Sequence, residues 1–481
     1  MTFNSLVFAV FLPIVFCLYW FVFGKNYKWQ NAFVVVASYV FYGWWSWKFL
    51  ILIAITSFCS WGSGLLISGC GDNHRKAWWI SAANIILNLG ILGLFKYYDF
   101  FAQSFADLFL GGKSDGILLH LILPVGISFY TFQALSYSID VYRGKLEPTK
   151  DIVQFFAYVS FFPQLVAGPI ERATNLLPQF ARKREFDYSQ AVDGLRQMLW
   201  GFFKKIVIAD WCALYVDEAF GDIPGHSGMQ LIAAAILFAF QIYGDFSGYS
   251  DIAIGTAKLF GIKLMRNFAM PYFSRDIAEF WRRWHISLTT WFRDYLYIPL
   301  GGSRCSKAKI VRNIFIIFLV SGFWHGANWT FLAWGAFHAL LFLPLILTGN
   351  NRKYKEVVAP DRVFPSFKEF GQILLTFALV TVGWVIFRAD NLPQAWEFIL
   401  GMFTWNTWKE ISFVVSAPFL VRAIWIVIML VVEWIDRKEE HGLSMVGVKY
   451  RALRYAVYFA LILVTILYFD DGSPKFIYFQ F

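Results

Sequence analysis

Two histidines lie where an otherwise apolar sequence is interrupted. His285 stands in WHIS within a basic segment, and His325 stands in FWHGANW between two apolar runs. An ionisable side chain at membrane depth is costly, and it is therefore a functional candidate by default. Burial favours the neutral imidazole, which is the form that a general base needs. The pattern thus allows His325 to act as a catalytic base, but a structural histidine that bridges two helices fits it equally well.

The histidines and cysteines of the sequence predict no metal site. Neither His285 nor His325 has a carboxylate or a second histidine at the spacing of metal ligands. The five cysteines are scattered and include no CxxC pair, which also argues against a disulfide framework. A further histidine, His338, lies inside the apolar run FLAWGAFHALLF. That position favours a hydrogen bond between helices over a reactive role.

Polar residues close one apolar run, in the segment DFSGYSD that begins at Asp245. The carboxylate of Asp245 and the hydroxyls of Ser247 and Ser250 could line a pore or a substrate tunnel. Asp and Ser also favour helix caps and turns, so a local structural role fits the same pattern. Both interpretations of these three residues stay open at this point.

Basic side chains gather in and after the segment that holds His285. The forked guanidinium of Arg and the ammonium of Lys match phosphate oxygens, so a phosphate-bearing ligand would suit them. Retention of cations on the cytoplasmic side of a membrane and contact with anionic lipid predict the same residues. The candidates for a phosphate site are Arg282, Arg283, Arg293, Lys307 and Lys309.

The elements that carry these residues must be membrane helices, because 58% of the 481 residues are hydrophobic and only 15% are charged. Soluble domains have about 45–50% apolar and about 25% charged residues. About a dozen apolar runs approach the roughly 20 residues that a helix needs to cross a bilayer. This composition excludes a soluble enzyme, a disordered chain and a membrane β-barrel, whose strands alternate in short segments.

The charge of the loops predicts how the chain crosses the membrane. The first apolar run, 5–23, follows no Lys or Arg and lacks a cleavage pattern, so we expect a retained span. Lys and Arg are retained in cytoplasmic loops, and their distribution favours a multi-pass chain in membrane lipid with both termini outside the cytoplasm. The same bias explains the net charge of +10 without nucleic acid as a partner. The other predicted spans are 31–47, 49–68, 77–95, 117–137, 199–220, 229–244, 313–323, 329–347, 371–387, 412–434 and 452–469.

Two further apolar segments, 152–170 and 277–300, have cation-rich flanks at both ends. Both flanks of each segment should therefore lie on one side of the membrane, and we expect each segment to enter and return. The first contains Pro163, Gly168 and Pro169, which interrupt a helix. Broken backbone at membrane depth is tolerated only where protein or a water-filled cavity covers it. Two such segments describe a funnel that opens to the cytoplasm.

Four strings resemble the membrane-bound O-acyltransferase family: FFPQLVAGPIER, QIYGDFSGYSDIAIG, FWRRWHISLTTWFRDYLYIPLGG and SGFWHGANWTFLAWGAFHA. The resemblance covers nearly the whole chain and is greatest to the bacterial branch that acetylates alginate or peptidoglycan, or that transfers D-alanine to teichoic acids. It implies a single all-α domain, residues 1–481. In that domain about twelve membrane helices and the re-entrant segments would form a ring around a central tunnel.

The resemblance implies an O-acyltransferase of the bacterial inner membrane. It would move an acyl group, expected to be acetyl, from a cytoplasmic thioester to a hydroxyl outside the cytoplasm. The thioester, acetyl-CoA or an acyl carrier protein, would be a co-substrate, with no permanently bound cofactor. The acceptor would belong to an extracytoplasmic polysaccharide, such as alginate or peptidoglycan, reached through an SGNH-type esterase-like partner.

The resemblance also assigns roles to residues of the two histidine motifs. His325 would be the catalytic base, and His285 would hold the thioester or polarise its carbonyl. Trp324 would wall the site, and Asn328 would donate to the developing oxyanion. Near the end of the chain, Tyr478 resembles in position an acyl-carrying tyrosine of related systems, although an interfacial aromatic anchor also explains FIYFQF.

Two other functions stay open from the sequence. A transporter or flippase for a lipid-linked sugar would use the buried histidines as proton relays and would cleave no thioester. A lipid O-acyltransferase would receive its acceptor sideways from the bilayer and would yield an acylated lipid. Thioester cleavage and the identity of the acylated product therefore separate the three functions.

Overall fold

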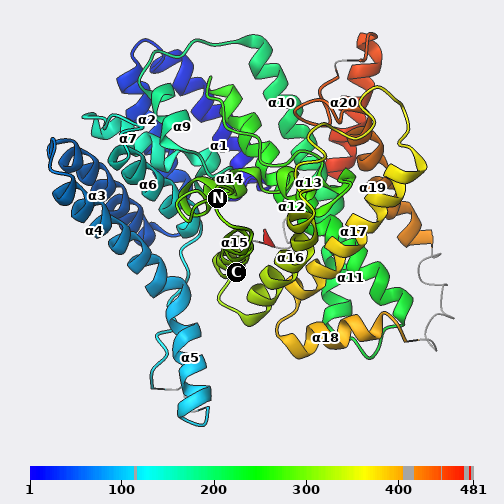
Figure 1. The fold of residues 1–481 in the computed structure, drawn as a ribbon. Coiled ribbons are helices and arrows are strands. Elements are labelled where there is room, and N and C mark those ends of the chain that lie inside the picture. The colour runs from blue at the N-terminus through cyan, green and yellow to red at the C-terminus, as the bar shows by residue number, and fades with distance from the viewer. Residues whose placement is uncertain (113–115, 405–416, 446, 471–475, 478–481) are drawn as a thin grey trace. The chain divides into compact units, whose positions relative to one another are not determined.

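A computed structural model describes residues 1–112, 116–404, 417–445, 447–470 and 476–477. Over these residues the secondary structure is helical and contains no β-strand, in agreement with the all-α prediction. Figure 1 shows the helices of the chain. The chain divides into two compact units. Unit 1 contains Met1–Leu195 with Ala253–Met265, and unit 2 contains Arg196–Ile252 with Arg266–Phe481. The single-domain expectation stays a prediction.

Six described helices are long and apolar enough to cross a membrane, and a shorter apolar helix covers Leu6–Val22. With the apolar composition, these helices identify a membrane protein. Some described helices at other predicted spans are shorter, such as α2 (Tyr27–Gly43) with 17 residues and α6 (Ile127–Tyr142) with 16. The six helices are Trp47–Ser68, His74–Phe109, Gly228–Leu259, Lys307–His325, Trp329–Leu347 and Phe367–Arg388.

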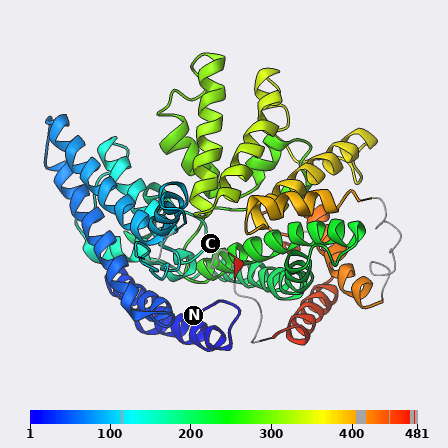
Figure 2. The same cartoon turned by 90° about the horizontal axis from the view of Figure 1, so that it is seen from below.

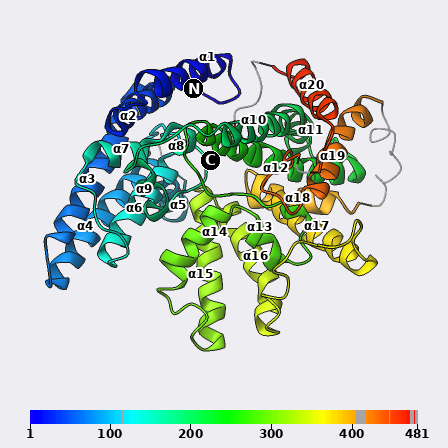
Figure 3. The same cartoon turned by 90° about the horizontal axis from the view of Figure 1, so that it is seen from above.

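In unit 1, α3 (Leu50–Ser68), α4 (His74–Leu92) and α6 pack against one another. Figure 3 shows α3 and α4 side by side. The hydroxyl of Ser63 on α3 and the hydroxyl of Ser138 on α6 form a buried hydrogen bond of 3.3 Å. Such bonds and close packing hold membrane helices together, because the surrounding lipid is as apolar as the helices themselves.

The predicted span 117–137 is wrong in its first half. Residues 118–126 contain no helix, and α6 begins only after Gly126, whose φ of 76° is left-handed. A Cβ at this position would also meet the backbone of Leu165, so glycine suits both the turn and the close approach. An apolar run reports burial or lipid contact, but it does not report where a helix can start.

Both segments that we predicted to re-enter the membrane are broken helices. The first forms α7 (Ile152–Ser160) and the four-residue α8 (Phe162–Leu165), with Pro163 in the first turn of α8. The second forms α13 (Ile277–Arg283) and α14 (Ile286–Phe292). The interruption predicted in the first segment is therefore confirmed, and the break in the second is a finding of the structure. The return of each segment to one side of the membrane stays a prediction.

Unit 2 holds a closely packed helix pair, α15 (Lys307–His325) and α16 (Trp329–Leu347), which Figures 2 and 3 show from below and above. A Cβ at Gly335 of α16 would overlap the backbone of Phe318 on α15, so a small residue permits this approach. Helix α16 packs in turn on α17 (Phe367–Arg388). The predicted span 329–347 coincides with α16.

The remaining α-helices of the described residues complete the fold. They are α1 (Leu6–Cys17), α5 (Tyr98–Phe109), α9 (Ala173–Phe180), α10 (Tyr188–Phe202), α11 (Asp210–Gly221), α12 (Gly228–Leu259), α18 (Leu392–Gly401), α19 (Ala417–Ile435) and α20 (Arg451–Leu467). Among the described residues, four π-helical turns lie between α-helices or at their ends: η1 (Leu18–Val22), η3 (Gly93–Tyr97), η4 (Phe203–Ala209) and η6 (Arg293–Tyr297). Two 3-10 turns, η2 (Trp47–Phe49) and η5 (Pro271–Phe273), complete the described elements.

One buried carboxyl of unit 1 lies outside the six long helices. Glu171 is fully buried and accepts hydrogen bonds from the Met265 backbone N–H and from Asn175 Nδ2. Burial raises the pKa of Glu171 to about 7, and these two bonds only partly offset the effect. The folded state therefore binds this proton more tightly than the unfolded chain does.

We expect Glu171→Gln to raise the unfolding temperature at pH 8 but not at pH 4.5. Because the pKa of Glu171 is higher in the folded state, wild-type stability falls as pH rises from about 4.5 to 7, by about 3 kcal/mol at most. The neutral amide avoids this loss. Thermal unfolding of the detergent-purified chain at both pH values measures it, with the exposed Asp72→Asn as control. A gain of equal size at pH 4.5 and pH 8 would contradict the assignment.

Candidate functional site

His285 lies at the break between α13 and α14 in unit 2. Its backbone adopts a left-handed conformation, with φ at 43°, which is uncommon for a residue with a side chain. The break is closed by backbone hydrogen bonds from Ile286 N–H to the Asn267 carbonyl and from Ala269 N–H to the Arg283 carbonyl, both 2.9 Å. His285 is only 1% exposed, so the break holds its ring inside the protein.

His325 is the last residue of α15, and it is 4% exposed. Gly326 follows it in an extended conformation, and a Cβ there would overlap the ring of Phe331. The turn between α15 and α16 therefore needs a glycine directly after the histidine. This geometry places a buried imidazole at the end of one apolar helix and just before the start of the next.

The structure brings the two histidines together within unit 2. Their ring centroids are 6.4 Å apart, and the rings are inclined by 60°. Trp324 contacts both rings, with centroid distances of 5.9 Å to His285 and 4.9 Å to His325. Phe246 packs at 4.7 Å from His285, and Phe387 at 5.3 Å from His325. The pair is thus enclosed by aromatic side chains, and Trp324 lies against both histidine rings.

Asn328 has a different environment from the one that an oxyanion donor needs. It is the N-cap of α16, and its Oδ1 accepts from the backbone N–H of Thr330. Its Nδ2 donates to the Asp390 carbonyl at 2.8 Å. Both polar atoms of this amide are therefore used to hold helix ends, and we do not carry the oxyanion role forward.

Asn267 is the residue of this centre that sequence reasoning missed. It is fully buried, its Oδ1 lies 3.1 Å from Nδ1 of His285, and its Nδ2 donates to Ser250 Oγ at 3.0 Å. Ser287 also donates to Oδ1, at 2.8 Å. A neutral amide in a polar stretch carries no hydropathy signal, so only the fold reveals its contact with the histidine.

The predicted phosphate-binding arginines are engaged by the protein itself. Arg282 donates to the carbonyls of Asn351 and Tyr354, at 2.8 and 2.5 Å. Arg283 is paired with Glu279 at 2.8 Å. The two arginines therefore hold α13 and the loop that follows α16, although the side chain of Arg282 is still exposed.

The other predicted cations are more accessible. Arg293 is 56% exposed and is paired with its neighbour Asp294 at 2.7 Å. Lys307 and Lys309 are exposed at the start of α15. These three side chains are the predicted phosphate ligands that stay open to an outside partner.

The polar residues of the DFSGYSD segment lie inside α12, which runs unbroken over Gly228–Leu259. The cap-and-turn interpretation is therefore wrong, and so is the predicted end of this span at residue 244. Asp245, Ser247 and Ser250 are all buried. Each bonds to a neighbour in unit 2, so their role as a tunnel lining stays a prediction.

Two lysines in the π-helical turn η4 provide most of these partners. Lys204 lies 2.6 Å from Asp251 and donates to Ser247 Oγ at 2.8 Å. Lys205 lies 2.6 Å from both Asp210 and Asp245. Sequence reasoning missed these lysines, although two adjacent cations inside the predicted span 199–220 were a sufficient signal, because buried charges need partners.

The chain end reaches this network. The backbone N–H of Ile477 donates to Asp245 at 2.6 Å, and the ring of Phe476 packs 4.7 Å from that of Tyr249. Phe476 also packs at 5.9 Å from Phe246, which in turn contacts His285. The proposed carrier Tyr478 lies outside the described residues, so its role is untested.

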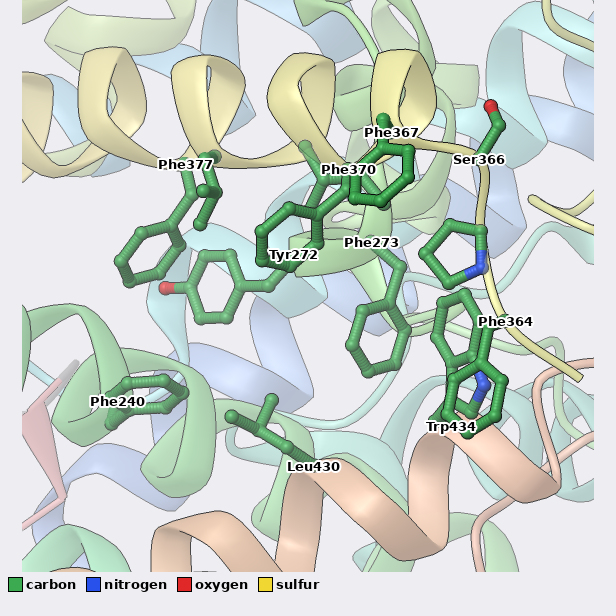
Figure 4. Close-up of a pocket in the computed structure, with 13 residues that line it drawn as sticks. Phe240, Tyr272, Phe273, Phe364, Ser366, Phe367, Phe370, Phe377, Leu430 and Trp434 are labelled. Atoms are coloured by element: carbon green, nitrogen blue, oxygen red, sulfur yellow. The ribbon is translucent and has the colours of Figure 1, made fainter.

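A separate apolar pocket of about 700 Å³ lies in unit 2, between α17, the turn η5 and α19. Figure 4 shows the aromatic rings of Tyr272, Phe273 and Phe377 facing into it. Neither histidine lines this pocket. Its lining is almost entirely apolar, as expected for a groove that meets lipid chains, so we do not assign the acyl-transfer chemistry to it.

His338 is not the hydrogen-bonding residue that its position predicted. It is fully buried among aromatic rings, with Trp334 at 5.0 Å and Trp281 at 5.1 Å. Among the described residues, neither of its ring nitrogens has a hydrogen-bond partner. The reason is its surroundings, since the neighbouring helices present rings and Gly383 to it rather than polar groups.

Comparison with known proteins gives consistent similarities. A profile of MBOAT, the membrane-bound O-acyltransferase family, matches residues 148–368, which include both central histidines. The probable alginate O-acetylase AlgI of Pseudomonas aeruginosa is 41% identical over 411 residues, which are 85% of this chain and 76% of that protein. The peptidoglycan O-acetyltransferase of Helicobacter pylori is 37% identical over 429 residues, 83% of this chain and 79% of that protein. The teichoic acid D-alanyltransferase of Bacillus subtilis is 27% identical over 378 residues, which are 76% of this chain and 91% of that protein.

We expect Asp245→Ala to lower the unfolding temperature strongly. The change removes one of the two carboxylates of buried Lys205 and leaves the Ile477 N–H without its acceptor. Breaking a buried ion pair from one side costs about 3–5 kcal/mol. Thermal unfolding measures the loss, and the control is Asp361→Ala, whose exposed pair with Lys438 should contribute less than about 1 kcal/mol. Equal effects of the two changes would refute the buried network.

Proposed function

Because the chain belongs to the membrane-bound O-acyltransferase family, we propose that it transfers an acyl group, here acetyl, from a cytoplasmic thioester to a hydroxyl for extracytoplasmic polysaccharide O-acetylation. Relatives named for alginate, peptidoglycan and teichoic acid modification support the polymer as the final acceptor. Lipid O-acylation and transport of a lipid-linked sugar are the two other functions to be tested.

The observation that carries this proposal is the pair of buried imidazoles at two helix breaks. The rings of His285 and His325 are 6.4 Å apart, so one small reacting group can contact both. Aromatic walls exclude water, which would otherwise hydrolyse the thioester. Burial also keeps an imidazole in its neutral form, as base catalysis requires.

The reaction divides between the two histidines as follows. His325 takes the proton of the acceptor hydroxyl while the oxygen attacks the thioester carbonyl, which makes the new C–O bond. The carbon–sulfur bond then breaks, and the thiolate leaves with the proton that His325 had taken. A well-placed general base contributes typically 10²–10⁴-fold to such a step. His285, whose ring centroid is 6.4 Å from that of His325, helps to position the reacting groups.

Acetyl-CoA is the donor that we propose, with an acyl carrier protein as the alternative. The nucleotide of coenzyme A is polyanionic and stays at the cytoplasmic surface, while its thin thiol arm reaches inward. Arg293, Lys307 and Lys309 are exposed and suit its phosphates. Arg282 and Arg283 act in this proposal by holding α13, and thus the segment that carries His285.

The remaining proposals concern topology and partners. We propose about twelve crossings in the bacterial inner membrane, both termini outside the cytoplasm, and a tunnel from the funnel to the outer face. An SGNH-type esterase-like partner would carry the acetyl group to the polymer, with Tyr478 as a candidate acyl carrier. Asp245, Ser247 and Ser250 stay our candidates for the tunnel wall.

We expect His325→Ala to abolish the release of free thiol from acetyl-CoA, with a loss of about 10²–10⁴-fold. The assay uses the purified full-length chain in lipid nanodiscs, with the polysaccharide and the SGNH-type partner added as the acceptor system, and a thiol reagent that detects free coenzyme A. The matched control is His338→Leu, which replaces a buried imidazole without hydrogen bonds among the described residues and should keep most of the activity.

Each other function predicts a distinct result in that assay. A transporter would release no thiol in the wild-type protein, and this result would end the acyltransferase proposal. A lipid O-acyltransferase would release thiol, but labelled acetyl would appear in the nanodisc lipid rather than in glycan. An unchanged rate in His325→Ala would remove this residue as the base.

We also expect the purified chain alone to leave a large polysaccharide unmodified. The active pair is buried, and a polymer cannot reach it without an intermediate carrier. Radiolabelled acetyl-CoA, the chain in sealed proteoliposomes and external polymer should yield labelled polymer only after the SGNH-type partner is added outside. Labelling of the polymer by the chain alone would refute the need for that partner.

A further inference from the structure

Asn267 lies in contact with His285 but belongs to none of the motifs that point to catalysis. Its side chain is fully buried in unit 2. The backbone carbonyl of Asn267 accepts from Ile286 N–H at 2.9 Å, while its side-chain Oδ1 faces His285 and Ser287. One residue therefore holds both the backbone after the histidine and the histidine ring.

The hydrogen-bond partners identify which atom of the amide faces His285. The backbone N–H of Ser287, which can only donate, points at this atom from 3.4 Å, so the atom is an oxygen. On the other side, the Nδ2 group donates to Ser250 Oγ at 3.0 Å. The amide orientation thus follows from its neighbours at both ends.

This orientation determines where the proton of the imidazole lies. An amide oxygen accepts but cannot donate, so the facing Nδ1 of His285, 3.1 Å away, must carry a hydrogen. In the neutral ring, the other nitrogen, Nε2, then has a free lone pair. Nε2 is buried, and among the described residues it has no hydrogen-bond partner.

We propose that Asn267 is the positioning residue of the active site, which fixes His285 in the Nδ1–H tautomer and presents Nε2 as an acceptor to the reacting hydroxyl. This inference rests on the acyltransferase function proposed above. It changes the role of His285, because a neutral ring without hydrogen on Nε2 cannot polarise the thioester carbonyl. His285 instead accepts the single hydrogen bond of the acceptor hydroxyl when the acceptor binds, which orients its oxygen, and the hydroxyl turns this hydrogen to His325 as the oxygen attacks.

The surroundings of His285 indicate that Asn267 acts on its ring through one hydrogen bond and not through charge. The rings that contact it are Phe246 on α12, Phe268, Trp324 and His325 on α15. Its hydrogen-bonding neighbours, Asn267 and Ser287, are neutral. His325 is thus the titratable side chain among these contacts.

A double-mutant cycle tests the proposal with the purified full chain and the thiol-release assay. Asn267→Leu should lower kcat by about 10- to 100-fold and leave KM for acetyl-CoA nearly unchanged, because the ring loses its orientation while donor binding is intact. In the His285→Ala background the same change should cost less than about 2-fold, since the residue acts through the histidine.

The matched control is Asn313→Leu. Asn313 is another fully buried amide of unit 2, and it donates to the Leu300 carbonyl at 3.1 Å without contact to either central histidine. The effect of Asn313→Leu on kcat should be the same in the wild-type and His285→Ala backgrounds. An equal cost of Asn267→Leu in both backgrounds would show a structural role only and would overturn the proposal.

If the activity of His285→Ala falls below detection, the pH profile of Asn267→Asp tests the positioning role instead. The carboxylate still accepts from Nδ1, so activity should exceed that of Asn267→Leu, and the acid limb of kcat/KM should move to higher pH by about one unit or more. A profile that stays in place would overturn the proposal. Loss of thiol release in the wild-type chain would instead reject the proposed function, so the two failures are distinguishable.

Discussion

A helix that breaks among apolar neighbours leaves backbone groups that water cannot reach, and this constraint organises the centre of unit 2. Both central histidines lie at such breaks. At His285, the free backbone groups pair with the segment 267–269, and at the break after His325 the side chain of Asn328 caps the next helix. Both rings at these breaks are buried inside the protein, and the hydrogen bonds that close the breaks fix the local backbone.

Burial alone does not make a histidine functional here, as His338 demonstrates. His338 and His325 share Trp334 as a ring neighbour, and both are buried. His338, however, lies in the middle of the continuous helix α16, where helix packing fills the space around it. His285 differs in having a break at its own position and an amide that orients its ring. A backbone opening and an orienting partner, added to burial, define the candidate site.

Hydropathy predicted the elements of this fold better than their limits. The run 329–347 became α16 without change, because a cap residue precedes it and its apolar face is long enough to continue. The first half of the run 117–137 failed, since Pro124 lacks an N–H and Gly126 turns left-handed, and these two residues were too few to end the apolar run. The span 229–244 was too short for the opposite reason, because polar residues ended the apolar run but did not end the helix.

Prediction of the site from the sequence was limited in a similar way, because charged and polar groups depend on partners that are distant in the sequence. Two histidines could be found because an ionisable group is conspicuous in an apolar run, whereas Asn267, the amide that orients His285, could not. The string DFSGYSD suggested a turn or a tunnel, since its partners were distant in sequence. In the structure Lys205 pairs with Asp245, and Lys204 contacts both Ser247 and Asp251. A buried ammonium is stable only with such neighbours, so the adjacent lysines of η4 and the polar string of α12 explain each other's presence.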